Sequence, residues 1–356
     1  MEEVLPEGKH FRLVNESELP EIIDFLGNYL PDSIKFHQTL KTFLKDRVWE
    51  FYFYVTKTWP EQAVILHFPG MTKTPNNKLY ESFSVFCPCD QLDNMYLLLE
   101  EEVLIDWTQP IFLNFTHSQI VEKLEEMYNE RGGIMEKLYG DIYGLMKPEQ
   151  GLTAEEDVAA DTRVVYTDEA VLSQLSPSHA KTIHDLYPAN NMECVQVFER
   201  LIEKLPCYGI FSTSGDLAAW MVQSYYGAMF SMQTRPEYRR KGYGLVLAKY
   251  LTKLVTERGY IPFVVIRPEN DASKGLYTKL GFKKYFQTVR AVLKPSEMAA
   301  ANDAQGGGTT ATQRNQPPEQ ADSGTGPQER PQHTLDSQID INNVNGDIQK
   351  EDTTDD

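Results

Sequence analysis

The sequence predicts a mixed α/β protein, and three observations lead to this. Short apolar runs alternate in the second half with helical patterns, in the order strand, glycine-rich loop, helix, strand, helix, strand. The composition, 41% hydrophobic and 11% aromatic, suffices for packed cores. The length of 356 residues leaves room for about two domains of roughly 100 to 200 residues each.

Changes in composition divide the chain into segments. The stretch 147–161 holds a proline, a glycine and an acidic run, which is typical of a linker. Residues 296–356 contain no Phe, Tyr or Trp and carry twelve acidic against three basic side chains, a charge of −9. Such a segment cannot bury enough apolar surface to offset its ordering entropy. We expect an N-terminal α/β domain at 1–146, a linker at 147–162, a second α/β domain at 163–295 and a disordered acidic tail at 296–356.

The net charge of −18 argues against a general nucleic-acid binder, because affinity for phosphate depends on clustered Lys and Arg. Apolar runs such as Val64–Phe68 are far shorter than the roughly 20 residues of a membrane span. Met1–Val4 is acidic, unlike a signal or transit peptide. We therefore expect an intracellular protein, cytoplasmic or mitochondrial, without a membrane anchor. The acidic tail could bind a protein partner, and the alternative is that it is simply a solvated segment without a partner.

The cysteines predict no metal site. Cys87 and Cys89 form a C-x-C pair, and no second Cys or His pair at zinc-like spacing accompanies them.

In the second half, turn-forming residues separate the apolar runs Cys207–Phe211 and Leu217–Val222, which indicates a β-hairpin. Gly227 marks a further turn, and Ala228–Met232 is predicted to continue as a third strand.

Apolar residues then recur from Leu247 to Val255 with helical spacing, and Gly259 suits the end of that helix. Ile261–Ile266 is an almost wholly apolar strand, as expected when both faces are covered. We expect Asp271 to cap the next helix, which ends at Gly281.

The segment Arg239-Arg240-Lys241-Gly242-Tyr243-Gly244 precedes the first of these helices. Its two glycines let the backbone approach an anion closely, and the N–H groups and dipole of the helix N-terminus attract phosphate. Arg239, Arg240 and Lys241 add positive charge, so a pyrophosphate is a suitable ligand. The alternative is an ordinary basic turn.

A second motif, Asn270-x-x-Ser273-x-x-x-Tyr277, lies on the next helix. Tyr277 is either a core tyrosine or a proton donor to a leaving thiolate, because the ordinary pKa of tyrosine, about 10, exceeds the roughly 8.5 of a thiol. Asn270 is either a turn former or a hydrogen-bonding clamp on a cofactor.

Together these motifs resemble the GNAT superfamily of acyl-CoA-dependent acyltransferases. The resemblance implies a mixed sheet splayed at its centre, with acyl-CoA or acetyl-CoA as co-substrate and no metal. In that family the R/Q-x-x-G-x-G/A loop holds the pyrophosphate, and a tyrosine acts on the coenzyme A sulfur, which Tyr277 matches. The strand before the loop lines the pantetheine arm. The residues implied to bind the cofactor are Met232, Gln233, Thr234, Arg239, Arg240, Lys241, Gly242, Tyr243, Gly244, Asn270 and Ser273.

The chain further resembles the glycine N-acyltransferase family. The shared features are Pro236-Glu237-Tyr238-Arg239, Trp220, His179-Ala180, Trp59-Pro60 and Leu104–Trp107. The N-terminal domain is then a diverged α/β domain, for which a related fold is one alternative. The implied reaction transfers an acyl group from acyl-CoA to the amine of glycine or another small amino acid or amine.

One position departs from the family. Ala228 stands where a carboxylate would deprotonate the substrate ammonium, so the general base is open. Glu237 and His179 are candidates for the base, and Tyr226 is a poorer third. Each also has an ordinary alternative, as a turn charge, a helix-surface residue or a packing group.

Two other hypotheses about function stay open. One is a GNAT enzyme for an arylalkylamine or a protein N-terminus, and the other is a CoA-binding, catalytically weak interaction protein.

Overall fold

The computed structural model describes residues 7–69, 82–146, 163–167, 170–187 and 194–295. The predicted linker and the predicted acidic tail lie outside these ranges. The described residues all fall in one compact unit, Met1–Gln305, so the division of the chain near 147–162 stays a prediction.

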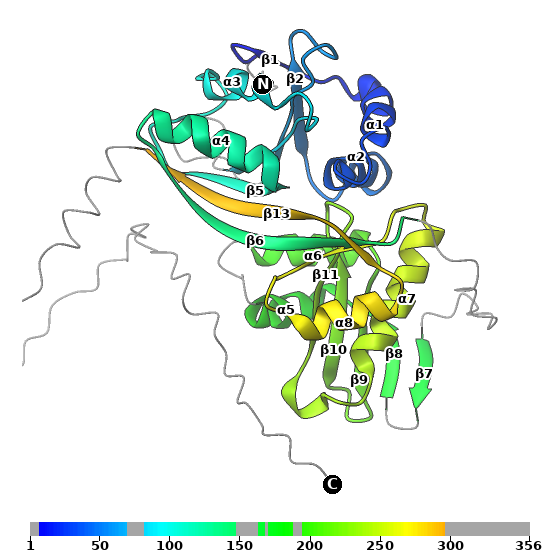
Figure 1. The fold of residues 1–356 in the computed structure, drawn as a ribbon. Coiled ribbons are helices and arrows are strands. Elements are labelled where there is room, and N and C mark those ends of the chain that lie inside the picture. Colours follow the sequence, from blue (N-terminus) through cyan, green and yellow to red (C-terminus); the bar gives the residue numbers. More distant parts are fainter. Residues whose placement is uncertain (1–6, 70–81, 147–162, 168–169, 188–193, 296–356) are drawn as a thin grey trace, which may run out of the picture. The chain divides into compact units, whose positions relative to one another are not determined.

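Two sheets form among the described residues (Figure 1). The larger has the order β1-β2-β3-β4-β5-β13-β6-β12 and the smaller β11-β10-β9-β8-β7. The strands of the larger sheet are β1 (Phe11–Leu13), β2 (Phe51–Thr56), β3 (Ile65–Pro69), β4 (Ser82–Phe86), β5 (Ile111–His117), β6 (Ile134–Gly144), β12 (Phe263–Ile266) and β13 (Lys283–Lys294). Those of the smaller are β7 (Arg163–Thr167), β8 (Ala170–Gln174), β9 (Cys207–Ser212), β10 (Leu217–Gln223) and β11 (Met229–Thr234).

The pairing makes the larger sheet mixed. β4 and β5 run parallel, whereas β13 is antiparallel to both β5 and β6. In Figure 1, β13, the last described strand, lies between these two strands of the N-terminal half. β12 pairs with the other edge of β6. The two predicted domains therefore share one sheet.

Helices cover these sheets and enclose three apolar cores. They are α1 (Leu19–Gly27), α2 (Ile34–Asp46), α3 (Tyr96–Leu99), α4 (Ser118–Glu130), α5 (Ala180–Leu186), α6 (Val195–Lys204), α7 (Tyr243–Glu257) and α8 (Asp271–Lys279), with short 3-10 turns that include η3 (Pro177–His179) and η5 (Pro236–Tyr238). One core lies around α3, α4 and the N-terminal strands, a second around α1, α2 and α6, and a third around α7, α8 and β10. No helix in the described ranges is both long and apolar enough to cross a bilayer.

Most of the elements predicted in the second half are present. β9 and β10 form the predicted hairpin, and Gly259 and Gly281 adopt the left-handed conformation just after α7 and α8. One detail of the prediction was wrong: Asn270, not Asp271, caps α8, because its Oδ1 accepts the N–H of Ser273 at 3.0 Å. Both residue types can cap, and the register of the turn decides between them.

The two sheets meet at β11 and β12 without pairing. These strands contact one another, yet β11 is the edge of the smaller sheet and β12 the edge of the larger, and no ladder joins them. Both motifs follow these two strands directly, so this break between the sheets positions the candidate site.

Candidate functional site

The pairing of β11 with β10 is irregular near the break between the two sheets. The register shifts between Trp220 and Val222, and Ser231, opposite that shift, has φ of 52°. A positive φ is uncommon for a residue other than glycine and marks a bulge in the ladder. The bulge turns the strand next to the residues predicted to line a pantetheine arm.

The basic loop leads from β11 through η5 into α7. Gly242 forms the N-cap of α7 with φ of 78°, a conformation that costs glycine little. Arg239, Arg240 and Lys241 are exposed, and Arg240 also has a positive φ, 65°. The helix therefore begins beside three solvent-facing cations, which is favourable for an anionic group.

Gly244, in the first turn of α7, leaves space beside the helix. A Cβ built there would meet nothing nearer than 3.9 Å, and its neighbours at that distance are the side chains of Met232 and Leu276. Met232 comes from β11 and Leu276 from α8. The glycine thus faces the strand and the helix that carry the other candidate residues.

Tyr277 reaches the same place from α8. Its side chain is buried, with its ring against Phe282 at 5.1 Å between centroids, and its hydroxyl lies 3.8 Å from Met232 Sδ. Burial raises the pKa of Tyr277 above its usual range. Met232 therefore contacts both the hydroxyl of Tyr277 and the space beside Gly244.

Several other residues predicted to bind the cofactor make contacts within the protein that stabilise the fold. Asn270 caps α8 through the N–H of Ser273, Gln233 donates from Nε2 to the carbonyl of Leu186 at 2.9 Å, and the ring of Tyr243 is buried in the core. The backbone carbonyl of Thr234 accepts a long 3.5 Å hydrogen bond from Arg239 Nε. Asn270 thus acts as a turn former, and the geometry does not test its role as a clamp.

The base candidates lie in different surroundings. Glu237 is exposed on η5. His179 Nδ1 accepts the N–H of Ser176 at 3.0 Å, which closes η3, and the ring lies against Phe211. Tyr226 is buried among aromatic rings. Ala228 is buried at the entrance to β11, and its carbonyl accepts the N–H of Ser224.

Sequence reasoning missed several buried polar atoms on β10, in the turn after it and on β11. Trp220 Nε1, both amide atoms of Gln223, Ser224 Oγ and Ser231 Oγ have no hydrogen-bond partner among the described residues. A buried polar atom without a partner is costly, so each of them calls for a partner such as an ordered water. The signal was a polar Gln-Ser pair at the end of an apolar strand.

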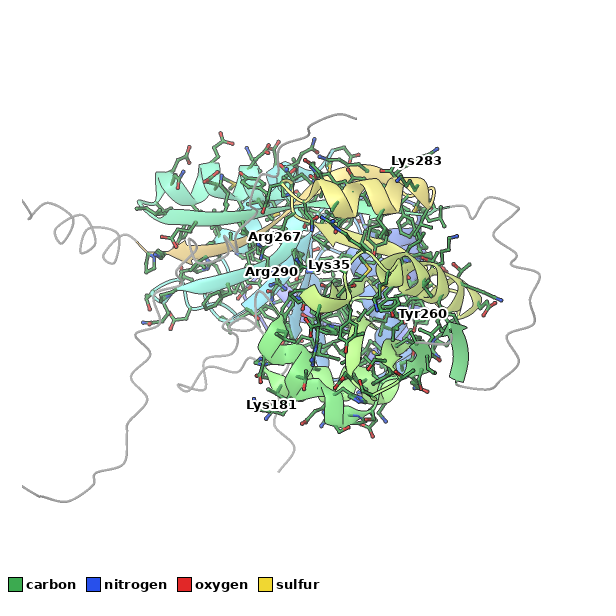
Figure 2. All side chains as sticks on the ribbon, turned by 90° about the horizontal axis from the view of Figure 1, so that it is seen from below. Lys35, Lys181, Tyr260, Arg267, Lys283 and Arg290 are labelled. Carbon is green, nitrogen blue, oxygen red and sulfur yellow. The ribbon has the colours of Figure 1, made fainter. Side chains whose placement is uncertain are left out.

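It also missed Lys35, on α2 of the N-terminal half. The side chain is buried, and Nζ donates to Ser84 Oγ at 2.5 Å and to the carbonyl of Phe115 at 2.9 Å. Its ammonium lies 6.0 Å from the ring centroid of Tyr226. Figure 2 shows Lys35 and Arg290 near one another, and both contact the ring of Phe115. A cation thus lies close to the turn that precedes Ala228.

Comparison with known proteins adds independent findings. Residues 207–291 match the family model described as FR47-like protein. Glycine N-acyltransferase of Bos taurus is 20% identical over 220 residues, which span 60% of this chain and 75% of that protein.

Among solved structures, a Drosophila protein superposes with a TM-score of 0.67 at 20% identity, over 80% of this chain and 99% of that one. A GCN5-related N-acetyltransferase from Sphaerobacter thermophilus gives a TM-score of 0.42 at 12% identity, over 80% of this chain and 94% of that chain.

These findings confirm the predicted resemblance and the mixed α/β fold class. The family match runs from the start of β9 through most of β13 and includes both motifs.

Proposed function

We propose that this chain, whose residues 207–291 match the FR47-like family, transfers an acyl group from acyl-CoA to the amine of glycine or another small amino acid or amine. One observation carries the proposal. Met232 lies against both the helix turn that follows the basic loop and the hydroxyl of Tyr277. The helix end that we propose for the phosphates and the tyrosine that we propose as proton donor thus both contact Met232 of β11.

The basic loop supports binding of the coenzyme A phosphates. The N-terminus of α7 offers backbone N–H groups without helical partners, and its dipole favours an anion. The three exposed cations supply charge in a protein whose net charge is −18. From that end, an extended thiol arm would follow β11 toward Tyr277, past the open space at Gly244.

The reaction needs one proton to leave the attacking nitrogen and one to reach sulfur. The neutral amine attacks the thioester carbonyl carbon, the C–S bond breaks, and the sulfur takes the electron pair. Tyr277 would deliver its hydroxyl proton to that sulfur. The attacking nitrogen loses its extra proton to water or to the open general base, and a proton from solvent restores the phenol of Tyr277. The products are an amide and free coenzyme A.

Burial changes the comparison between the pKa of Tyr277 and the pKa of the leaving thiol. The pKa of Tyr277 is raised, so full transfer of its proton to a thiolate of ordinary pKa is uphill. The same apolar surroundings raise the pKa of a thiolate formed beside it. Burial therefore raises the pKa of both groups, and Tyr277 keeps its proton until sulfur becomes negative.

The resemblance alone suggests that the acceptor binds near Ala228, at the turn between β10 and β11. Ala228 provides no carboxylate, so a water chain or a group such as Glu237 or His179 must take the ammonium proton. An arylalkylamine or a protein N-terminus is the alternative acceptor. A second alternative is a CoA-binding protein with weak catalysis, which the missing carboxylate at Ala228 supports.

A screen of acyl-CoA donors against amines tests the proposal. Purified protein is incubated with acetyl-, benzoyl- and longer acyl-CoA and with glycine, other amino acids and arylalkylamines, and thiol release and product mass are measured. We expect amine-dependent release of coenzyme A with at least one pairing. Tight acyl-CoA binding without release from any pairing would instead support the binding protein.

A further inference from the structure

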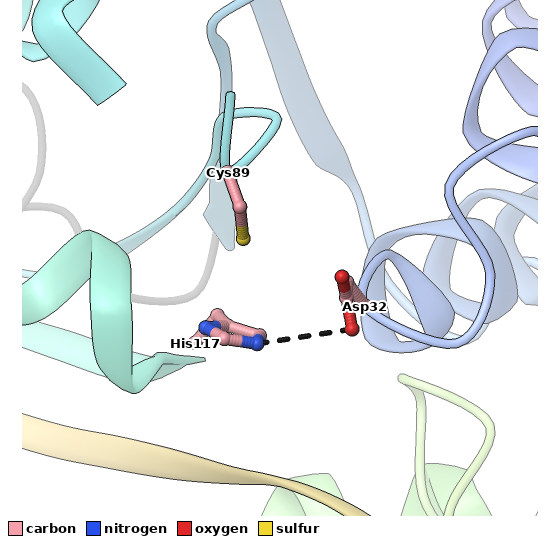
Figure 3. A group of neighbouring side chains, drawn as sticks. All are labelled: Asp32, Cys89 and His117. Carbon is pink, nitrogen blue, oxygen red and sulfur yellow. Dashed lines mark ion pairs between the residues drawn. The ribbon is translucent and has the colours of Figure 1, made fainter. Parts of the chain in front are cut away.

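Three donor side chains from the N-terminal half, none of them part of the two motifs, converge at one place. Asp32 lies between α1 and α2, Cys89 follows β4, and His117 ends β5 (Figure 3). One carboxylate oxygen, the thiol sulfur and one ring nitrogen all lie within 4.8 Å of one another. His117 Nε2 is 3.8 Å from Asp32 Oδ1. Among the described residues, this group brings together three different kinds of metal-binding atom.

The histidine of this group is held rigidly. Its side chain is 9% exposed, it stacks on Phe286 with 4.4 Å between ring centroids, and Nδ1 accepts the N–H of Gln119 at 3.2 Å. Asp32 is different, since 47% of its side chain is exposed. A fixed imidazole beside an adjustable carboxylate is suited to capture an ion without rearrangement of the fold.

A nucleophilic cysteine is a poorer interpretation of the group. A general base needs a ring nitrogen with a free lone pair facing the thiol. Here Nδ1 faces a backbone N–H and Nε2 faces the carboxylate of Asp32.

We infer that Asp32, Cys89 and His117 bind a divalent cation of the zinc class through three protein ligands, leaving a fourth position open. Sulfur, imidazole and carboxylate together are the ligands Zn²⁺ prefers, and three such ligands with one open position are typical of accessible zinc sites. Cys89 would release its proton on binding. The inference departs from the sequence prediction of no metal, because the donors come from three distant segments.

Coordination requires two local adjustments. Zinc bonds of about 2.0 to 2.3 Å demand that the donors close up, and the half-exposed Asp32 can rotate to do so. Binding through Nε2 places the ring proton on Nδ1, which gives up its bond from Gln119 N–H at the exposed start of α4. Water can replace that single bond, so the loss lowers affinity without preventing binding.

Zinc titration of the full-length protein tests this site independently of any acyl transfer. After treatment with a chelator, calorimetry with ZnCl₂ should give one tight site per chain, and Co²⁺ should give the visible absorption of a thiolate complex. Cys89→Ser and Asp32→Asn should each weaken zinc binding at least tenfold. Asp32→Asn replaces a half-exposed carboxylate, so it tests the site without disturbing a core.

Cys194→Ser provides the matched control, because this cysteine is exposed just before α6 and far from the group in sequence. Its affinity for zinc should equal that of the wild type. Absence of a one-to-one site, or equal affinity in the wild type, Cys89→Ser and Asp32→Asn, would overturn the inference. Loss of binding in Cys194→Ser alone would do the same.

Discussion

The hydroxyl of Tyr277 lies 3.8 Å from the sulfur of Met232, across the gap between helix α8 and strand β11. Thioether sulfur is a weak acceptor, so the phenol gives up little when it turns to a bound ligand. If acyl-CoA binds as we propose, a buried tyrosine with so weak a partner would be available to the thioester sulfur.

Replacement of Tyr277 by Phe tests this availability. Loss of a general acid lowers turnover by about 10² to 10⁴-fold, while the affinity for acyl-CoA should change little, because the ring still packs against Phe282. Steady-state rates and calorimetry with acyl-CoA measure the two quantities. An unchanged rate would return Tyr277 to a purely structural role.

Charge reversal in the basic loop should weaken cofactor binding. Charge-assisted contacts contribute about 1.5 to 3 kcal/mol, so Arg240→Glu and Lys241→Glu should each raise the Kd for acyl-CoA tenfold or more. Both side chains are exposed, and the fold should be unaffected. Lys249→Glu, an exposed position farther along α7, is the control. Equal affinity in all three variants would remove the loop from the cofactor site.

Two glycines of the loop should respond differently to alanine. Gly242 has φ of 78°, a conformation that costs other residues about 1 to 2 kcal/mol, so Gly242→Ala should lower the free energy of unfolding by that amount. A methyl group at Gly244 meets no atom nearer than 3.9 Å, so Gly244→Ala should fold normally. Alanine, which the family pattern also allows at this position, should keep acyl-CoA affinity, whereas Gly244→Leu should weaken acyl-CoA binding because its side chain fills the space assigned to the ligand. Denaturant unfolding and calorimetry separate the two effects, and normal acyl-CoA affinity in Gly244→Leu would contradict that assignment.

His67 should make the fold sensitive to mild acid. It is fully buried, stacks on Phe53, and has a pKa well below its ordinary value, chiefly because of burial and secondly because of the charge of Lys35. In the unfolded chain His67 has a pKa of about 6.5, so below this pH the unfolded chain binds a proton that the folded protein does not. The contribution of neutral His67 to the free energy of unfolding is therefore present above pH 6.5 and is lost as the pH falls below it.

Urea unfolding of the wild type and of His67→Leu at several pH values measures this dependence. Between pH 6.5 and 5.5, the slope of the unfolding free energy should be smaller in the variant, by at most about 1.4 kcal/mol per pH unit. The comparison of slopes separates titration from any change in packing. Identical slopes would show that His67 does not titrate differently in the two states.

The sequence predicted what is local in this fold. The hairpin at Ser212–Gly215 and the ends of α7 and α8 follow from turn chemistry and helical spacing, which involve neighbouring residues. The shift of the cap from Asp271 to Asn270 shows the limit of that method, since both residues cap well. The two motifs were found because their spacing is itself local.

Contacts between distant segments could not be predicted from one sequence. Nothing near Met232 indicates that its sulfur meets Tyr277, and nothing near Cys89 indicates His117. Lys35 has the appearance of a surface residue on a helix, but the carbonyl of Phe115 and the hydroxyl of Ser84 hold it inside. Such positions depend on how strands of different segments align, which local patterns do not encode.

The position of β13 between β5 and β6 bears on how the chain is made. During synthesis from the N-terminus, β5 and β6 emerge long before residues 283–294, which must pair with both. Until then each has an open edge, and such edges invite pairing with other chains. Correct folding therefore requires that these two strands avoid pairing with other chains until residues 283–294 leave the ribosome.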